Sequence, residues 1–268
     1  MDDPDRRPPT SINTGVSHSA RVWNHLLGGK DNYAADREAG DLILRMFPGI
    51  AHIARLQRRF LARAVQYLTG EVGIRQFLDV GTGLPTADNT HQVAQRLAPE
   101  SRIVYVDNDP LVLVHAQALL TSTPEGATDY VEADVRDPGR ILREAARTLD
   151  LTRPVALIML GIVGQIPDSE DPSSMVSRFL DSLPSGSHLA LSDGTNTNEA
   201  LNAALRVYND NSASSYHLRD PERIAGFFNG LELVEPGVVT TSRWRPDVAD
   251  IGNGPEEVDA ICGIGRKP

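Results

Sequence analysis

The stretch Phe77-Leu78-Asp79-Val80-Gly81-Thr82-Gly83 decides the fold of this 268-residue chain. A short apolar run ends in a tight glycine turn, and an amphipathic segment follows at about residues 86–97, so the pattern predicts a strand, a turn and a helix. Gly81 and Gly83 allow the backbone to approach a ligand closely, and the first turn of the helix offers N–H groups without intrahelical partners. The unit therefore predicts a ligand site at the carboxyl end of a parallel strand.

The same alternation of apolar runs and amphipathic segments continues toward the C-terminus. Strands are predicted at residues 76–80, 103–106, 129–132, 155–160, 188–191, 231–234 and 258–264. Aspartate–proline pairs predict helix starts, with the carboxylate as N-cap, at Asp109-Pro110, Asp137-Pro138, Asp171-Pro172 and Asp220-Pro221. This order predicts an α/β fold with a doubly wound, mostly parallel seven-stranded sheet that ends in a strand hairpin.

The first part of the chain has no strand pattern. Apolar residues at helical spacing over residues 11–70 predict an N-terminal helical extension, which we expect to act as a lid. Residues 1–10 are acidic and rich in proline and predict a disordered tail. Residues 71–268 are then the sheet domain.

Asp79 and position 86 distinguish between classes of ligand. A dinucleotide fingerprint would have a third glycine at position 86, where Thr86 follows Pro85. Close packing against a diphosphate is therefore disfavoured, and with it a nicotinamide-dependent oxidoreductase. A carboxylate at Asp79, on the strand before the first glycine, suits a ligand with a cationic amino group.

Further acidic residues follow the next strands. Asp107 lies 24 residues beyond Gly83, near the spacing at which an acid after the second strand binds ribose hydroxyls. Asp134 follows the third strand and suits an adenine amino group, and Leu160-Gly161 ends the fourth, where backbone can border a ligand. Each carboxylate alone also fits a helix cap or a solvated loop. Because the carboxyl ends of parallel strands meet at one edge of a sheet, the set predicts S-adenosyl-L-methionine as the cofactor.

These residues resemble a known class of enzymes. Asp79-x-Gly81-x-Gly83 with Asp107 and Asp134 is similar to the class I S-adenosylmethionine-dependent methyltransferases over about residues 74–192. Nearly the whole chain resembles a bacterial family of S-adenosyl methyltransferases, formerly catalogued as a domain of unknown function, through residues 19–37, 77–89, 105–110, 234–237 and 242–246. The resemblance implies a Rossmann-like methyltransferase and no particular acceptor. Neighbouring residues complete the predicted cofactor site: Thr82, Asn108 and Val135.

The sequence also narrows the transfer chemistry. Methylation at cytosine C5 needs a cysteine nucleophile, but Cys262 lies in the last predicted strand and is expected to be a buried structural thiol. Residues 160–165 lack the Asn/Asp-Pro-Pro-Tyr/Phe run typical of adenine N6 enzymes, and no spacing predicts a metal site. We expect transfer by proximity and alignment to a small-molecule acceptor, with at most one general base, for which Tyr33 and His25 are candidates.

The segment Gly28-Gly29-Lys30-Asp31-Asn32-Tyr33 joins two predicted helices. It fits a helix C-cap and turn followed by an N-cap at Asp31 or Asn32. That interpretation leaves Lys30 unexplained, because the chain uses arginine 24 times and lysine only at positions 30 and 267. We therefore expect the loop to close over the cofactor, with Lys30 near its carboxylate or the acceptor and Tyr33 against the purine.

Charge and composition exclude several classes. The net charge of −10 argues against bulk nucleic-acid binding, and the lack of a signal or long apolar run predicts a cytoplasmic protein without a membrane span. Residues 1–75 hold 11 basic and 8 acidic side chains, against 15 and 28 in the remainder. An arginine stripe at residues 45–63 therefore either packs on the acidic part or binds an anionic partner. The oligomeric state stays open, as does an alternative function as a non-catalytic sensor of the cofactor.

Overall fold

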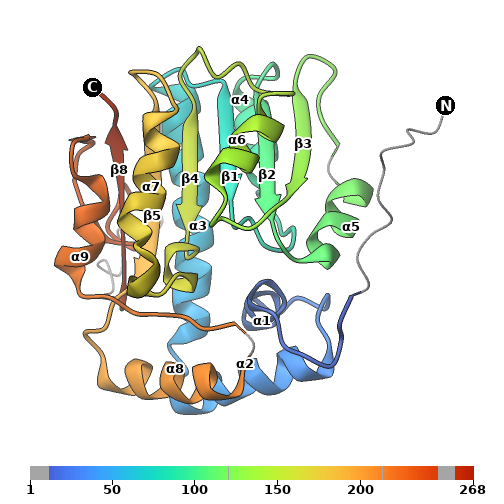
Figure 1. The fold of residues 1–268 in the computed structure, drawn as a ribbon, viewed down its shortest axis with the longest axis vertical. Coiled ribbons are helices and arrows are strands. Elements are labelled where there is room, and N and C mark those ends of the chain that lie inside the picture. Colours follow the sequence, from blue (N-terminus) through green and yellow to red (C-terminus); the bar gives the residue numbers. More distant parts are fainter. Residues whose placement is uncertain (1–11, 120, 213, 247–256) are drawn as a thin grey trace.

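The structure, a computed structural model, describes residues 12–119, 121–212, 214–246 and 257–268. A central sheet lies between two layers of helices, and further helices lie beyond one end of it (Figure 1). The strands are β1 (Gln76–Val80), β2 (Arg102–Asp107), β3 (Ala127–Glu132), β4 (Ala156–Leu160), β5 (His188–Gly194), β6 (Glu232–Leu233), β7 (Val239–Thr240) and β8 (Ala260–Arg266). The helices are α1 (Ser19–Leu26), α2 (Ala34–Met46), α3 (Ile50–Gly70), α4 (Thr90–Leu97), α5 (Pro110–Leu119), α6 (Pro138–Ala145), α7 (Pro172–Asp181), α8 (Glu199–Asn211) and α9 (Pro221–Ala225), with the 3-10 turns η1 (Val163–Gln165), η2 (Asp168–Glu170) and η3 (Gly226–Phe228).

The sheet has the order β3-β2-β1-β4-β5-β8-β6, and the two-residue strand β7 pairs with β8. Strands β1 to β5 are parallel, whereas β8 runs antiparallel to β5 and β6. The predicted doubly wound, mostly parallel sheet is confirmed. The two predicted closing strands also pair antiparallel, as β6 and β8, and β8 lies between β5 and β6. Strand β7 is too short to leave an alternating pattern in the sequence.

Both faces of the sheet carry apolar layers. One face packs against α6, α7 and α9, with Leu78 and Phe179 among its buried residues. The other packs against α3 and α4, with Phe77 and Phe60 buried there. Since side chains alternate along a strand, Phe77 and Asp79 point to the α3 side. This alternation places Asp79 against α3 and α4.

The aspartate–proline pairs start helices as predicted. Asp137, Asp171 and Asp220 each accept a hydrogen bond from the backbone N–H three residues later, and α5 begins at Pro110 after Asp109. Helix α4 begins at Thr90, four residues later than predicted. The intervening residues form a turn in which Asn89 Oδ1 accepts a hydrogen bond from the N–H of Thr86 at 3.0 Å. Asn89 is also the N-cap residue of α4, so the helix begins after it.

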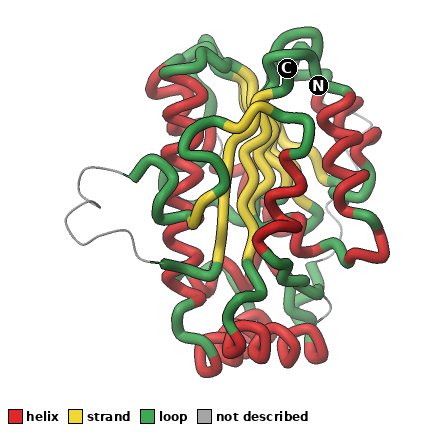
Figure 2. The backbone as a smooth tube through the Cα atoms, turned by 90° about the vertical axis from the view of Figure 1, so that its left-hand side faces the viewer, coloured by secondary structure: helices red, strands yellow, loops and turns green. Residues whose placement is uncertain are grey.

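Helices α1, α2 and α8 lie beyond the carboxyl ends of the parallel strands (Figures 1 and 2). Their apolar faces form a core of their own with the start of α3, in which Val22, Ile43, Ile53 and Leu205 are buried. We call α1, α2 and α8 the helical cap. Its first two helices come from the predicted extension, but α8 comes from the sheet part of the chain, and α3 covers the sheet.

A buried charged network attaches the helical cap to the sheet. The Asp109 carboxylate lies 3.0 Å from Arg21 Nε and 3.2 Å from His18 Nδ1. Asp36 accepts hydrogen bonds from the backbone N–H groups of His18 and Tyr33, at 2.9 and 2.8 Å. The start of α1 is therefore tied both to α2 and to the turn after β2. In the described part of the chain, no helix is long and apolar enough to cross a membrane.

Candidate active site

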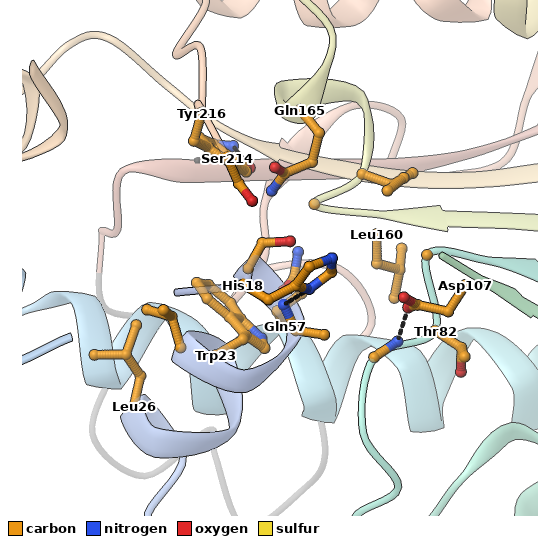
Figure 3. Close-up of a pocket in the computed structure, with 18 of the residues that line it drawn as sticks. His18, Trp23, Leu26, Gln57, Thr82, Asp107, Leu160, Gln165, Ser214 and Tyr216 are labelled. Atoms are coloured by element: carbon orange, nitrogen blue, oxygen red, sulfur yellow. Dashed lines mark hydrogen bonds between the residues drawn. The ribbon is translucent and has the colours of Figure 1, made fainter. Parts of the chain in front are cut away.

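A cavity of about 350 Å³ lies between the carboxyl ends of the parallel strands and the helical cap (Figure 3). This volume falls within the roughly 300–1,000 Å³ that is usual for small-molecule sites. Ten of the residues that the sequence predicts for the cofactor line it: Asp79, Gly81, Thr82, Gly83, Asp107, Asn108, Asp134, Val135, Leu160 and Gly161. The sheet topology thus brings together residues from four strand ends.

The glycine turn after β1 needs its glycines. Gly81 and Gly83 have φ angles of +74° and +65°, a region that other residues rarely adopt. A Cβ atom at Gly81 would also lie 2.7 Å from side-chain atoms of Ile162. The N–H of Gly83 donates to Asp107 Oδ2 at 2.8 Å, which fixes the turn against the end of β2. The turn therefore leaves its backbone close to the cavity.

Asp79 is a buried carboxylate at the wall of the cavity. Burial raises its pKa to about 6, although the hydroxyl of Thr90, 2.6 Å away, and the charge of Arg58 counteract this shift. In the free protein, Thr90 and Arg58 therefore only partly offset the cost of burying the charged carboxylate. A cationic group of a ligand would stabilise this charge further.

Arg58 of α3 lies on the same wall, and the sequence interpretation did not assign it to the site. Its Nη2 donates to the carbonyl of Ala87 at 3.4 Å and to Asn89 Oδ1 at 3.3 Å, while its Nε is buried without a hydrogen-bond partner among the described residues. Burial lowers its pKa and Asp79 raises it. Adjacent positive and negative groups at one wall fit the carboxylate and amino group of an amino-acid ligand. The signal was present in the arginine stripe, but the sequence does not distinguish its members.

Asp107 and Asp134 follow the second and third strands and differ in exposure. Asp107 is buried, and burial raises its pKa. The N–H groups of Asp109 and Gly83 donate hydrogen bonds to it and partly offset this rise in pKa. The Asp134 side chain is 43% exposed and accepts a hydrogen bond from the N–H of Arg136 at 2.9 Å. Asp134 therefore orders a turn and also lines the cavity, and its contact with adenine stays a prediction.

The structure does not bring Lys30, Tyr33 or His25 to the cavity lining. Lys30 is exposed, and His25 pairs with Asp41 at 2.8 Å. Tyr33 is the N-cap residue of α2, and the guanidinium of Arg21 lies over its ring.

The expected N-cap at Asp31 or Asn32 is therefore wrong. Asp36 in the first turn of α2 accepts the Tyr33 N–H, which moves the helix start to Ala34. Asn32 instead donates to Asn24 Oδ1 at 2.9 Å and supports the loop from within.

The part of the cavity under the helical cap is mostly apolar. Its side chains from α2 and α8 carry no charge: Ile43, Leu201, Leu205 and Tyr208. Polar groups enter from elsewhere, and they include Gln57 of α3, Gln165 of η1, Ser214 and Tyr216 after α8 (Figure 3), and Asp259 before β8. Gln57 donates to Ser192 Oγ at 3.0 Å, across 135 residues of sequence. This compartment was not predicted, because its residues share no local motif.

Burial also describes two other residues that the sequence analysis discussed. Cys262 is fully buried in β8, and burial raises the pKa of its thiol well above the usual range, as expected of a structural cysteine. Arg63 of the arginine stripe is buried and donates to the carbonyls of Trp244 and Thr241 at 2.9 and 2.7 Å. Among the described residues, no group of three or more His, Cys, Asp or Glu side chains is placed to hold a metal ion.

The sheet order, the antiparallel β8 and the cavity at the strand ends define a Rossmann-like methyltransferase. The plantazolicin methyltransferase BpumL, solved in complex with a triazolic desmethylPZN analog and SAH, shares this fold at 10% identity, with a TM-score of 0.50 over 93% of this chain and 96% of its own.

Sequence comparison identifies the family. Residues 5–268 match the S-adenosyl methyltransferase family, so the chain belongs to it, and the cofactor is S-adenosyl-L-methionine. A DUF574 family protein from Streptomyces avermitilis is 48% identical, with a TM-score of 0.92 over 96% of this chain and 100% of its own. A protein from Thermobifida fusca, assigned provisionally as a methyltransferase, is 40% identical, with a TM-score of 0.84 over 94% and 95%. No curated protein matches the chain.

Proposed function

We propose that the protein transfers the methyl group of S-adenosyl-L-methionine to a small-molecule acceptor bound under the helical cap. One observation carries this proposal: a single cavity joins the strand ends of β1 to β4 with a mostly apolar compartment beneath α1, α2 and α8. A protein that only sensed the cofactor would not need this second compartment, so the cavity favours catalysis over the sensor function.

We assign the cofactor's amino group to Asp79 and its carboxylate to Arg58, because these opposite charges share one wall of the cavity. The backbone of residues 81–83 would lie along the same part of the ligand. We assign the ribose to Asp107 with Asn108, and the adenine to Asp134 with Val135. Leu160 and Gly161 then border the ligand from β4.

S-adenosylmethionine supplies a methyl group that its sulfonium charge already activates. The residues of the chain therefore have to bind both reactants, align them and keep water out. The mostly apolar walls supply the exclusion of water, and the polar groups from η1 and the segment after α8 orient the acceptor.

The test incubates the protein with S-adenosylmethionine labelled in its methyl group and with a cell extract separated into small molecules and macromolecules. We expect label in a small-molecule product with wild-type protein and a large loss of label with Asp107→Asn. Label in the macromolecules alone would contradict the assigned acceptor class. Stoichiometric binding of the cofactor without any labelled product would favour the sensor function.

A further inference from the structure

Tyr216 lines the mostly apolar compartment, and its hydroxyl is hydrogen-bonded to a buried carboxylate. Its hydroxyl donates to Asp193 Oδ1, and Asp193, at the end of β5, is only 1% exposed. In Figure 3, Tyr216 lies with Ser214 and Gln165 on one side of the cavity, across from Trp23 and away from Asp107. The phenol thus separates the Asp193 carboxylate from the compartment.

The position of the Tyr216 ring is fixed by its surroundings. The backbone N–H of Tyr216 donates to Asn209 Oδ1 at 2.8 Å, and its backbone carbonyl accepts from Asn209 Nδ2 at 3.0 Å. A Cβ atom at Gly164 of η1 would lie 2.5 Å from the ring, so this glycine is what lets the ring lie flat against the turn. Such preorganisation is more than a surface tyrosine needs and is typical of a group that orients a ligand.

Asp193 has spare capacity to accept a proton. Its Oδ2 has no hydrogen-bond partner among the described residues and lies 3.9 Å from Arg219 Nη1. Burial raises its pKa to about 6, against the effects of Tyr216, Arg219 and the N–H groups of Gly194 and Gly164. Arg219 is itself shared with Asp168, which also pairs with Arg223, and His217 acts on Asp168. Above pH 6 the carboxylate is therefore ionised and can take a proton.

We propose that Tyr216 is a catalytic residue for methyl transfer to a hydroxyl group on a neutral, largely apolar acceptor, and that Asp193 is its positioning residue and final proton acceptor. This inference rests on the proposed function. In the transfer, the acceptor oxygen forms the bond to the methyl carbon while the carbon–sulfur bond breaks and its electron pair stays on sulfur. The acceptor proton moves to the Tyr216 oxygen as the phenol proton moves to Asp193, so one carboxylate is neutralised for each sulfonium consumed.

The substrate class follows from the walls of the compartment. The side chains of α2 and α8 offer no charge to an ionic acceptor. Asp259, which also lines the cavity, is a carboxylate that accepts hydrogen bonds from Asn198 Nδ2 at 3.0 Å and Thr197 Oγ1 at 3.4 Å, so it disfavours an anionic acceptor. A hydroxyl can donate a further hydrogen bond to the Tyr216 oxygen, which Asp193 already orients, whereas a methyl ether has no proton to donate to it.

Calorimetric titration tests the inference with 2-naphthol and 2-methoxynaphthalene as probes, on protein saturated with S-adenosylhomocysteine. We expect wild-type protein at pH 8 to bind the naphthol about tenfold more tightly than the ether. This preference should shrink as the pH falls from 8 to 5, because Asp193 becomes protonated. Tyr216→Phe should bind both probes equally. Asp193→Asn should retain a smaller preference that does not change with pH.

Tyr67→Phe is the matched control, because Tyr67 packs on Trp244 away from the cavity and should behave as wild type. Equal binding of the two probes by wild-type protein, binding of neither, or a preference that survives in Tyr216→Phe would overturn the inference. The titration with S-adenosylhomocysteine itself reports on the proposed function separately, since failure to bind it would refute the cofactor assignment and not the role of Tyr216.

Discussion

Asp79→Asn separates the cost of burying a carboxylate from its use in holding the cofactor. Burial raises the folded-state pKa of Asp79 from 3.8 to about 6. A shift of this size means that ionised Asp79 destabilises the free protein by about 3 kcal/mol at pH 8. Asparagine keeps an oxygen that can accept from Thr90 and carries no charge. We therefore expect the variant to be more stable than wild type by up to that amount.

The pH dependence of this effect has a definite sign. Below about pH 3 the carboxyl group is mostly protonated in both folded and unfolded chains, so it imposes almost no penalty. Between pH 4 and 6 the unfolded chain loses its proton first, and wild-type stability falls as the pH rises. The advantage of Asp79→Asn should therefore be complete at pH 8 and about half as large at pH 5.

Cofactor binding should change in the opposite direction. Removing the charge that faces the cofactor's amino group should weaken binding of S-adenosylhomocysteine by about tenfold to a hundredfold at pH 8. Wild-type affinity should fall about tenfold between pH 8 and pH 5, because only about a tenth of Asp79 is ionised at pH 5 in the free protein. The affinity of the variant should lack this dependence.

Urea unfolding measures the stability, and calorimetric titration measures the affinity. Asp181→Asn is the control, since Asp181 is exposed at the end of α7 and should change stability by less than about 0.5 kcal/mol. A variant at Asp79 that is less stable than wild type at pH 8, or that binds S-adenosylhomocysteine as well as wild type does, would refute the reasoning.

Three further substitutions test two residues that line the cavity and one that lies outside it. Arg58→Gln should weaken binding of S-adenosylhomocysteine about tenfold and leave binding of 5′-methylthioadenosine unchanged, because the latter has no carboxylate; equal losses for both would contradict the assignment. Gly81→Ala should lower the free energy of unfolding in urea by about 1–3 kcal/mol, because φ is +74° and the new Cβ would contact Ile162. This loss should exceed that of Gly230→Ala, where φ is +83° and no atom lies within 4 Å of the new Cβ. Lys30→Arg should leave affinity and stability unchanged, since Lys30 is exposed outside the cavity lining; a loss of affinity would restore the prediction that its loop closes over the cofactor.

Local patterns in the sequence were sufficient for most strands, for the helix starts at aspartate–proline pairs and for the glycine turn. Each depends on a few adjacent residues: a short apolar run makes β1, a carboxylate before a proline starts α6, and positive φ angles need Gly81 and Gly83. Asp79, Asp107 and Asp134 could be grouped in advance because parallel strands bring their carboxyl ends to one edge. The predicted start of α4 failed because a single asparagine cap outweighed a weak helical pattern.

Tertiary structure alone decided which charges face the cavity. Arg58 and Arg63 lie five residues apart on α3, yet the first lines the cavity beside Asp79 and the second hydrogen-bonds to the carbonyls of residues 241 and 244. Lys30 stood out by composition, but its loop points elsewhere. Tyr216 and Asp193 meet only because the segment after α8 folds back over the end of β5. Sequence fixes which side chains a strand end or a helix cap presents, whereas partners far apart in the chain are set by packing that no local pattern encodes.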